Sequence, residues 1–268
     1  LTGTSVIPSD FVQCPTPGST ITLAVASPVS NIPFTEVYAF PNIANLIGGT
    51  SYYDLNLAST QLDLSNSYQV TIAYCFTDNE GLVCLKSFEE TILKHQHRKI
   101  KIAAITSCSN VTGIKTPYHK VAKLIHKYNG LCFVDFACSG PYVEIDMHPE
   151  DKESYLDAIF FSPHKFLGGP GSTGILVFNK DLYTNKVPDT PGGGTVDWTN
   201  PWGEHKYVDN IEAREDGGTP AFLQTIKTAL SIQLKEKMGV KNIIDREHEL
   251  HEIIWAKFEK LENAHVLA

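Results

Sequence analysis

Short apolar runs alternate with segments of helical period from about residue 87 to residue 178. The predicted strands are Lys99–Ile105, Leu131–Asp135, Asp157–Phe161 and Gly174–Phe178, and the predicted helices are Ser87–Gln96 and a segment that begins at Pro117. Strand–helix–strand alternation is the pattern of a largely parallel sheet that is covered by helices. We therefore expect an α/β fold built on a mostly parallel sheet with flanking helices.

Two further helices are expected after this alternation. Thr219-Pro220 predicts the start of a long helix, with Thr219 as the N-cap and Pro220 at the first helical position. A second helix is predicted over about Val240 to Leu261, and its apolar side carries Ile243, Leu250, Ile254, Phe258 and Leu261.

The charge of the first 80 residues differs sharply from that of the remainder. These residues contain no Lys, Arg or His, and they carry six of the acidic side chains, hence −6 of the net charge of −8. Runs such as Thr20–Ala26 and Tyr68–Phe76 alternate at period two, and Thr35–Phe40 and Tyr52–Leu57 are weaker strand candidates. We predict a β-rich segment over 1–80 and a separate α/β part over 81–268.

Composition excludes several classes of protein. The acidic balance argues against nucleic-acid binding, and no apolar run is long enough for a membrane-spanning helix. None of the six cysteines forms a C-x-x-C pair, so no metal site is predicted. Cys108 and Cys132 are expected to be buried free thiols, whereas a disulfide among Cys14, Cys75 and Cys84 stays open. We expect a cytoplasmic protein, although Leu1 is not an initiator residue.

Polar side chains follow the ends of three neighbouring predicted strands. Asn110 follows the first strand, Asp135 ends the second, and Ser162, His164 and Lys165 follow the third. In an open parallel sheet, functional groups gather at the carboxyl ends of the strands. A lysine can form an imine with an aldehyde cofactor, and a carboxylate can keep a pyridinium nitrogen protonated. This combination favours a pyridoxal 5′-phosphate (PLP) site.

The stretch from about Gly81 to Ala268 resembles the class V aminotransferases, a group of fold-type I PLP enzymes that includes the cysteine desulfurases. The matching motifs, in order, are SNVTG at 109–113, VDFA at 134–137, SPHKFLGGPGSTG at 162–174, GGGT at 192–195 and REDGGTP at 214–220. Each motif alone is weak evidence, whereas the ordered set is specific.

The resemblance implies a role for each residue of the predicted site. Lys165 would be the Schiff-base lysine, with His164 beside it, and Asp135 would pair with the pyridine nitrogen. Ser162 and His164 would contact the phosphate, and Asn110 would lie near the substrate carboxylate. Asn110 also begins an N-glycosylation triplet, an interpretation that its place at the site disfavours.

The resemblance also implies a homodimer. Thr219 would reach the phosphate in the neighbouring subunit, and the loop that contains Gly193 and Gly194 would approach the same subunit boundary.

Three features depart from the family pattern. No recognisable Gly-rich turn that opens a helix, and no ring-stacking residue, lies in residues 1–80, where Gly48–Ser51 is the only candidate turn. Cys138 stands where cysteine desulfurases have Gln, and the chain ends at Ala268, before the expected C-terminal domain.

Two functions of different class therefore stay open. The first is a PLP-dependent enzyme that acts on an amino acid, by transamination or by cysteine desulfurase/lyase-like chemistry. The second is a non-catalytic interaction protein that keeps this scaffold, with residues 1–80 as an assembly module. A Rossmann nucleotide-binding function is disfavoured, because no G-x-G-x-x-G follows a strand.

Overall fold

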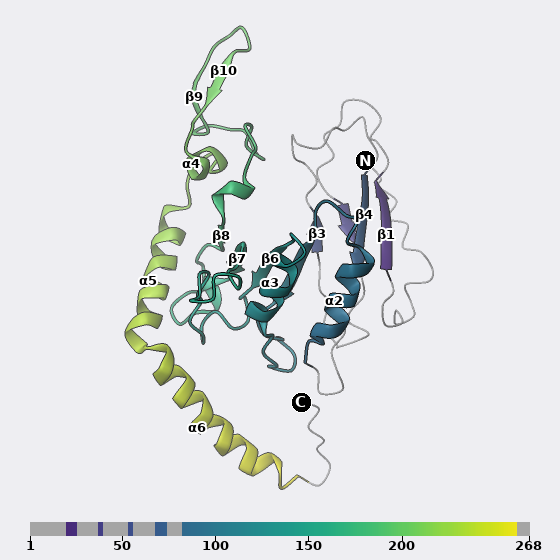
Figure 1. Cartoon of the computed structure of the whole chain (residues 1–268). Helices are drawn as coiled ribbons and strands as arrows, with labels where there is room; N and C mark the ends of the chain where they lie inside the picture. Colours follow the sequence, from purple (N-terminus) through teal and green to yellow (C-terminus); the bar gives the residue numbers. More distant parts are fainter. Residues whose placement is uncertain (1–19, 26–36, 40–52, 56–67, 74–81, 262–268) are drawn as a thin grey trace. The chain divides into compact units, whose positions relative to one another are not determined.

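The computed structural model describes residues 20–25, 37–39, 53–55, 68–73 and 82–261 (Figure 1). The chain divides into two units. The sheet unit comprises Cys75–Leu182 and Ala221–Ala268, and the hairpin unit comprises Leu1–Tyr74 and Tyr183–Pro220. The sheet unit holds all the strands of the predicted α/β alternation.

A four-stranded sheet in the order β5-β6-β7-β8 forms the centre of the sheet unit (Figure 1). Its strands are β5 (Ile102–Thr106), β6 (Leu131–Asp135), β7 (Ala158–Phe161) and β8 (Ile175–Phe178). The first three strands are parallel, and β8 runs antiparallel to β7. The predicted mostly parallel sheet is therefore confirmed.

Two helices bury one face of this sheet. They are α2 (Leu85–Lys94) and α3 (Tyr118–His126), whose Val121 and Ala122 are fully buried against Cys132 and Val134 of β6. Burying one large aliphatic side chain stabilises a fold by about 1.5–3 kcal/mol. Because strand side chains alternate between faces, Asp135 lies on the face opposite Val134.

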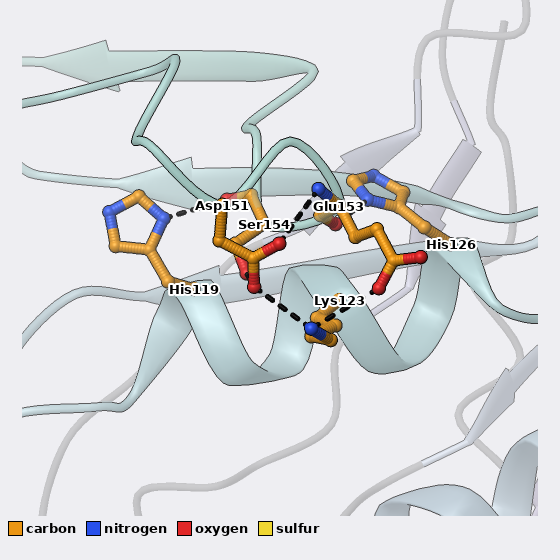
Figure 2. Close-up of polar contacts among 6 residues, drawn as sticks. All are labelled: His119, Lys123, His126, Asp151, Glu153 and Ser154. Atoms are coloured by element: carbon orange, nitrogen blue, oxygen red, sulfur yellow. Dashed lines mark hydrogen bonds and ion pairs between the residues drawn. The ribbon is translucent and has the colours of Figure 1, made fainter.

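Polar side chains of α3 hold the segment that leads into β7 (Figure 2). The contacts are His119 Nδ1 with the Ser154 carbonyl oxygen at 2.7 Å, Lys123 Nζ with Asp151 Oδ2 at 2.9 Å, and His126 Nδ1 with the Glu153 carbonyl oxygen at 2.8 Å. These bonds join α3 to the segment between β6 and β7. They therefore help to fix where β7 begins.

Two long helices follow the sheet, α5 (Phe222–Met238) and α6 (Val240–Phe258). The prediction that Thr219 caps the first of them is wrong: the N-cap is Ala221, which makes no side-chain capping bond. The Gly218 N–H donates to the Gly193 carbonyl oxygen at 2.7 Å. This bond holds the residue before Thr219 against a neighbouring loop, so the helix starts later. No helix in the described part of the chain has both the length and the apolar character needed to cross a membrane.

Helix α6 has no buried residue in the described structure, although it is amphipathic. Its apolar side remains exposed, with Leu250 at 42%, Ile254 at 49% and Phe258 at 47% of their accessible area.

The hairpin unit consists of antiparallel pairs and one short helix. β1 (Thr20–Val25) pairs with β4 (Tyr68–Ala73), β2 (Val37–Ala39) with β3 (Tyr53–Leu55), and β9 (Val196–Thr199) with β10 (His205–Tyr207), while α4 spans Ile211–Glu215. The rest of 1–81, with Cys14 and Cys75, lies outside the described residues. The β-rich segment and the boundary near residue 80 stay predictions.

Candidate active site

The carboxyl ends of β5, β6 and β7 lie at one edge of the sheet. In the register, Thr106 pairs with Asp135, and Asp135 pairs with Phe160. The turn that holds Asn110 and the segment Ser162–Lys165 follow these strands directly. The topology thus brings the five predicted residues of this unit to one edge.

Asp135 is half-buried at the end of β6, and its carboxylate is partly engaged. The Ala137 N–H donates to Asp135 Oδ1 at 2.7 Å. Among the described residues, Oδ2 accepts no hydrogen bond. One oxygen therefore orients the carboxylate, and the other is available to a ligand.

Two buried serines fix the backbone on which Asp135 sits. Ser107 donates from its backbone N–H at 2.8 Å and from its Oγ at 2.9 Å to the Asp135 carbonyl oxygen. Its Oγ also lies 2.5 Å from Ser139 Oγ. The sequence gives no periodic signal for this pair, because it depends on two turns that meet only in the folded sheet.

Asn110 lies exposed in a tight turn after β5. Ser109 Oγ accepts the N–H groups of Val111 and Thr112, both at 3.2 Å. The Asn110 side chain makes no hydrogen bond within the described part of the chain, so its amide is available to a ligand.

Lys165 and His164 lie in a 3₁₀ turn, η2 (Pro163–Lys165), that follows β7 directly. Both side chains are exposed, and Ser162 is half-buried before them. None of the three side chains has a hydrogen-bond or ion-pair partner in the described structure. The ring of Phe166 stacks on Phe161 at 5.8 Å and anchors the turn to β7.

Lys235 of α5 ties this turn to the turn that follows Asp135. Its Nζ donates to the carbonyl oxygens of Gly140 at 2.6 Å and Val143 at 2.5 Å, and it lies 5.5 Å from the centre of the Phe166 ring. Burial lowers the pKa of the Lys235 ammonium. Sequence reasoning missed this residue, because nothing in the periodicity of α5 separates it from a surface lysine.

A pocket of about 430 Å³ opens beside Lys165. Its walls include His164, Lys165, Lys235 and the apolar side chains of Tyr142 and Met238. Asp135, Ser162 and Asn110 do not line it. The structure thus gathers part of the predicted site around one cavity and leaves the other residues along the same sheet edge.

The remaining predicted residues lie in the hairpin unit. Gly193 accepts the Gly218 N–H, and this bond places the loop of Gly193 and Gly194 beside the segment that ends in Thr219. Gly194 has φ +88°, a conformation that favours glycine. Thr195 is fully buried, and its Oγ1 donates to the Gly192 carbonyl oxygen at 2.6 Å.

The donor set at the sheet edge fits PLP. Lys165 offers a free primary amine to an aldehyde, and Asp135 Oδ2 offers an acceptor to a protonated pyridine nitrogen. Ser162 and His164 offer donors to a phosphate. The described residues contain no group of three or more His, Cys, Asp or Glu that could hold a metal ion.

Comparison with known families gives a match over most of the chain. The family model described as aminotransferase class-V matches residues 56–268. This match starts before Gly81, where the resemblance seen in the motifs begins, and residues 1–55 lie outside it.

Individual relatives match about two thirds or more of the chain in length. A probable cysteine desulfurase from Halalkalibacterium halodurans is 29% identical over 72% of this chain and 45% of its own length. One from Pyrococcus abyssi is 29% identical over 65% of this chain and 40% of its own length. The chain therefore spans less than half the length of these curated relatives.

Solved structures show the same fold. The apo cysteine desulfurase from Thermococcus onnurineus NA1 superposes with a TM-score of 0.60 at 26% identity, over 70% of this chain and 44% of the other. The NifS-like protein from Rickettsia africae has a TM-score of 0.54 at 21% identity, over 70% of this chain and 46% of its own.

Proposed function

Because this chain belongs to the aminotransferase class-V family, which is PLP-dependent, we propose that it is part of a PLP-dependent enzyme that acts on an amino acid. The reaction is a transamination or a cysteine desulfurase/lyase-like cleavage. The names of the relatives, probable cysteine desulfurases, support the second chemistry.

The observation that carries this proposal is the set of uncommitted functional atoms at the sheet edge. Several polar groups elsewhere in the sheet unit are engaged: Lys123 and Lys127 are each ion-paired, and Asp157 is bonded to His126. Lys165, His164 and Asp135 Oδ2 have no such partners among the described residues. Unpaired polar groups gathered at strand ends are typical of a ligand site.

PLP, when bound, supplies an aldehyde for covalent attachment and an electron sink that weakens the bonds at the amino acid α-carbon. Lys165 would hold the cofactor, and its Nζ would accept or return a proton. Asp135 Oδ2 would accept a hydrogen bond from the protonated pyridine nitrogen. Ser162 and His164 would donate to the phosphate, and Asn110 to the substrate carboxylate.

A homodimer is part of the same proposal. Thr219 and the loop of Gly193 and Gly194 would contribute phosphate-binding groups to the neighbouring subunit. The hydrogen bond between Gly193 and Gly218 supports this role, because it holds the two segments together as one surface.

The proposal is tested by borohydride reduction of the chain in the presence of PLP, followed by peptide mass mapping. We expect a pyridoxyl adduct on Lys165, and we expect Lys165→Ala to lose it. Lys180→Ala is the matched control, because Lys180 is an exposed lysine of the same unit. It should keep the full adduct yield.

A folded chain without an adduct, or an adduct spread equally over surface lysines, contradicts the enzyme proposal. The non-catalytic scaffold would then become the better explanation. Folding is checked in the same samples by circular dichroism, so that an unfolded variant is not mistaken for an inactive site.

A further inference from the structure

Two cysteine thiols lie beside each other at the carboxyl edge of the sheet. Cys108 follows β5 by two residues, and Cys138 follows β6 by three. These strands are neighbours, with Thr106 paired to Asp135. The thiols of Cys108 and Cys138 both lie against one backbone group, the carbonyl oxygen of Ser109.

The surroundings hold both sulfur atoms in place. Cys108 Sγ lies 3.6 Å and Cys138 Sγ 3.9 Å from the same acceptor, the Ser109 carbonyl oxygen. Cys108 Sγ also donates to the Gly113 carbonyl oxygen at 3.1 Å. The bond between Ser107 and Ser139 joins the two turns directly next to the cysteines. The backbones of the two turns thus fix the positions of both cysteines, so their proximity does not depend on side-chain rotation alone.

The two thiols differ in their access to solvent. Cys108 is 8% exposed, whereas Cys138 is only half-buried. Burial, with a smaller contribution from Cys138, raises the pKa of the Cys108 thiol. A small oxidant therefore meets Cys138 first, and Cys108 is placed to react second.

The other described cysteines lack this arrangement. Cys132 is fully buried, and burial raises its pKa to about 12. Cys84 caps α2, where its Sγ accepts the Ser87 N–H at 3.5 Å.

We propose that Cys108 and Cys138 are an oxidation site that closes to an intramolecular disulfide under peroxide. Hydrogen peroxide oxidises the Cys138 thiol to a sulfenic acid and leaves one water. The Cys108 sulfur then attacks the sulfenic sulfur, the S–S bond forms, the S–O bond breaks, and a second water leaves. Two thiols lose two electrons and two protons in total, and these reduce one peroxide to two waters.

This disulfide would connect the turn of Asn110 to the turn that follows Asp135. If the proposed function holds, oxidation therefore acts on the site. The formation of the bond itself does not require PLP, so its test is independent of the cofactor.

The test treats the reduced full chain with hydrogen peroxide, blocks free thiols with N-ethylmaleimide, and maps peptides without reductant. We expect a linked pair of peptides that contain Cys108 and Cys138, two hydrogens lighter than their sum and lost after dithiothreitol. Because attack requires the Cys108 thiolate, the link should form faster at about pH 9 than at about pH 7.

Three variants sharpen the test. Cys138→Ser should abolish the linked peptides, and Cys84→Ser, the matched control, should leave them unchanged. Cys108→Ala should leave Cys138 as a sulfenic acid that dimedone traps. A chain in which Cys138 links instead to Cys14, Cys75 or Cys84, or in which Cys138 is oxidised without any link to Cys108, overturns the proposal.

Discussion

At the scale of single residues, His126 and Asp157 form a hydrogen-bonded pair inside the sheet unit. His126 Nε2 lies 2.9 Å from Asp157 Oδ2, and its Nδ1 lies 2.8 Å from the Glu153 carbonyl oxygen. The ring of His126 is thus held between two oxygen atoms of the segment that leads into β7. Asp157 Oδ2 also accepts the Cys132 N–H at 2.8 Å.

Replacement of Asp157 by Ala should therefore destabilise the chain strongly. Asp157 is 2% exposed, and its removal leaves His126 Nε2 and the buried Cys132 N–H without their partner. Leaving a buried polar group unpaired costs about 1–3 kcal/mol for each group. The free energy of unfolding in urea measures the loss.

Asp245→Ala provides the comparison for this experiment. Asp245 pairs with Lys241 on the surface of α6, where its side chain is 54% exposed. Its removal should change the free energy of unfolding by about 0.5 kcal/mol or less. Equal losses in the two variants would contradict the interpretation of Asp157 as a buried hydrogen-bond partner.

Asp151 allows a prediction of pH dependence (Figure 2). The hydrogen bond from Lys123, with further bonds from the Glu153 N–H and Ser154, lowers the pKa of Asp151 to about 2. An unfolded aspartate titrates near about 3.9. Since the folded pKa is the lower one, the stabilisation is present above about pH 4 and is lost as the pH falls toward about 2.

The difference in urea midpoint between the unmodified chain and Asp151→Asn should therefore be constant near neutral pH and shrink between about pH 4 and about pH 2. Added salt should reduce this difference at neutral pH, because the pair is on the surface. A difference that is unchanged at acid pH would show that Asp151 acts through packing and not through its charge.

The residues that could be predicted from sequence are those that follow directly from strand ends. Asp135 ends one apolar strand and Lys165 follows the next strand by four residues, so their place at the sheet edge follows from local pattern. Lys235 and the pair of Ser107 and Ser139 could not be predicted, because each acts across turns that are distant in sequence. Local periodicity carries no information about which turns meet.

At the scale of elements, the loop Ser162–Gly174 depends on close packing at Gly169. A Cβ added there would lie 1.8 Å from the Pro163 carbonyl oxygen and 2.9 Å from that of Phe166. The backbone that carries Lys165 would have to move. This explains why the chain uses glycine at a position without positive φ.

Gly169→Ala should therefore lower the free energy of unfolding by about 1–3 kcal/mol, as overpacking does, and reduce the yield of the pyridoxyl adduct on Lys165. Gly174→Ala is the matched control in the same loop, since the nearest atom to its added Cβ lies 4.0 Å away. It should keep both stability and adduct yield. A Gly169→Ala chain that behaves like this control contradicts the packing argument.

Most elements of the sheet unit could be predicted within a few residues, and β6 coincides with its prediction. The start of α5 could not be predicted. Thr219-Pro220 has the residues of a helix start, but the bond between Gly218 and Gly193 holds the chain in a loop until Ala221. Here a tertiary hydrogen bond prevails over a local propensity.

At the scale of the whole molecule, the candidate residues lie in two units. Asn110, Asp135, Ser162, His164 and Lys165 belong to the sheet unit, and Gly193, Gly194 and Thr219 belong to the hairpin unit. Family motifs predicted both groups from their order in the chain. No physical pattern in the sequence determines the position of one group relative to the other, because local periodicity describes single elements only.

The antiparallel pairing of β8 with β7 has a consequence for the order of folding. These strands enclose the short loop that carries Lys165, whereas the parallel strands are joined by longer connections, through α3 between β5 and β6 and through residues 136–157 between β6 and β7. Short loops cost less entropy to close, so nearby contacts form earlier. We therefore expect the lysine loop to close before β6 brings Asp135 alongside it. Binding of the cofactor would then be possible only after β6 has paired with β7.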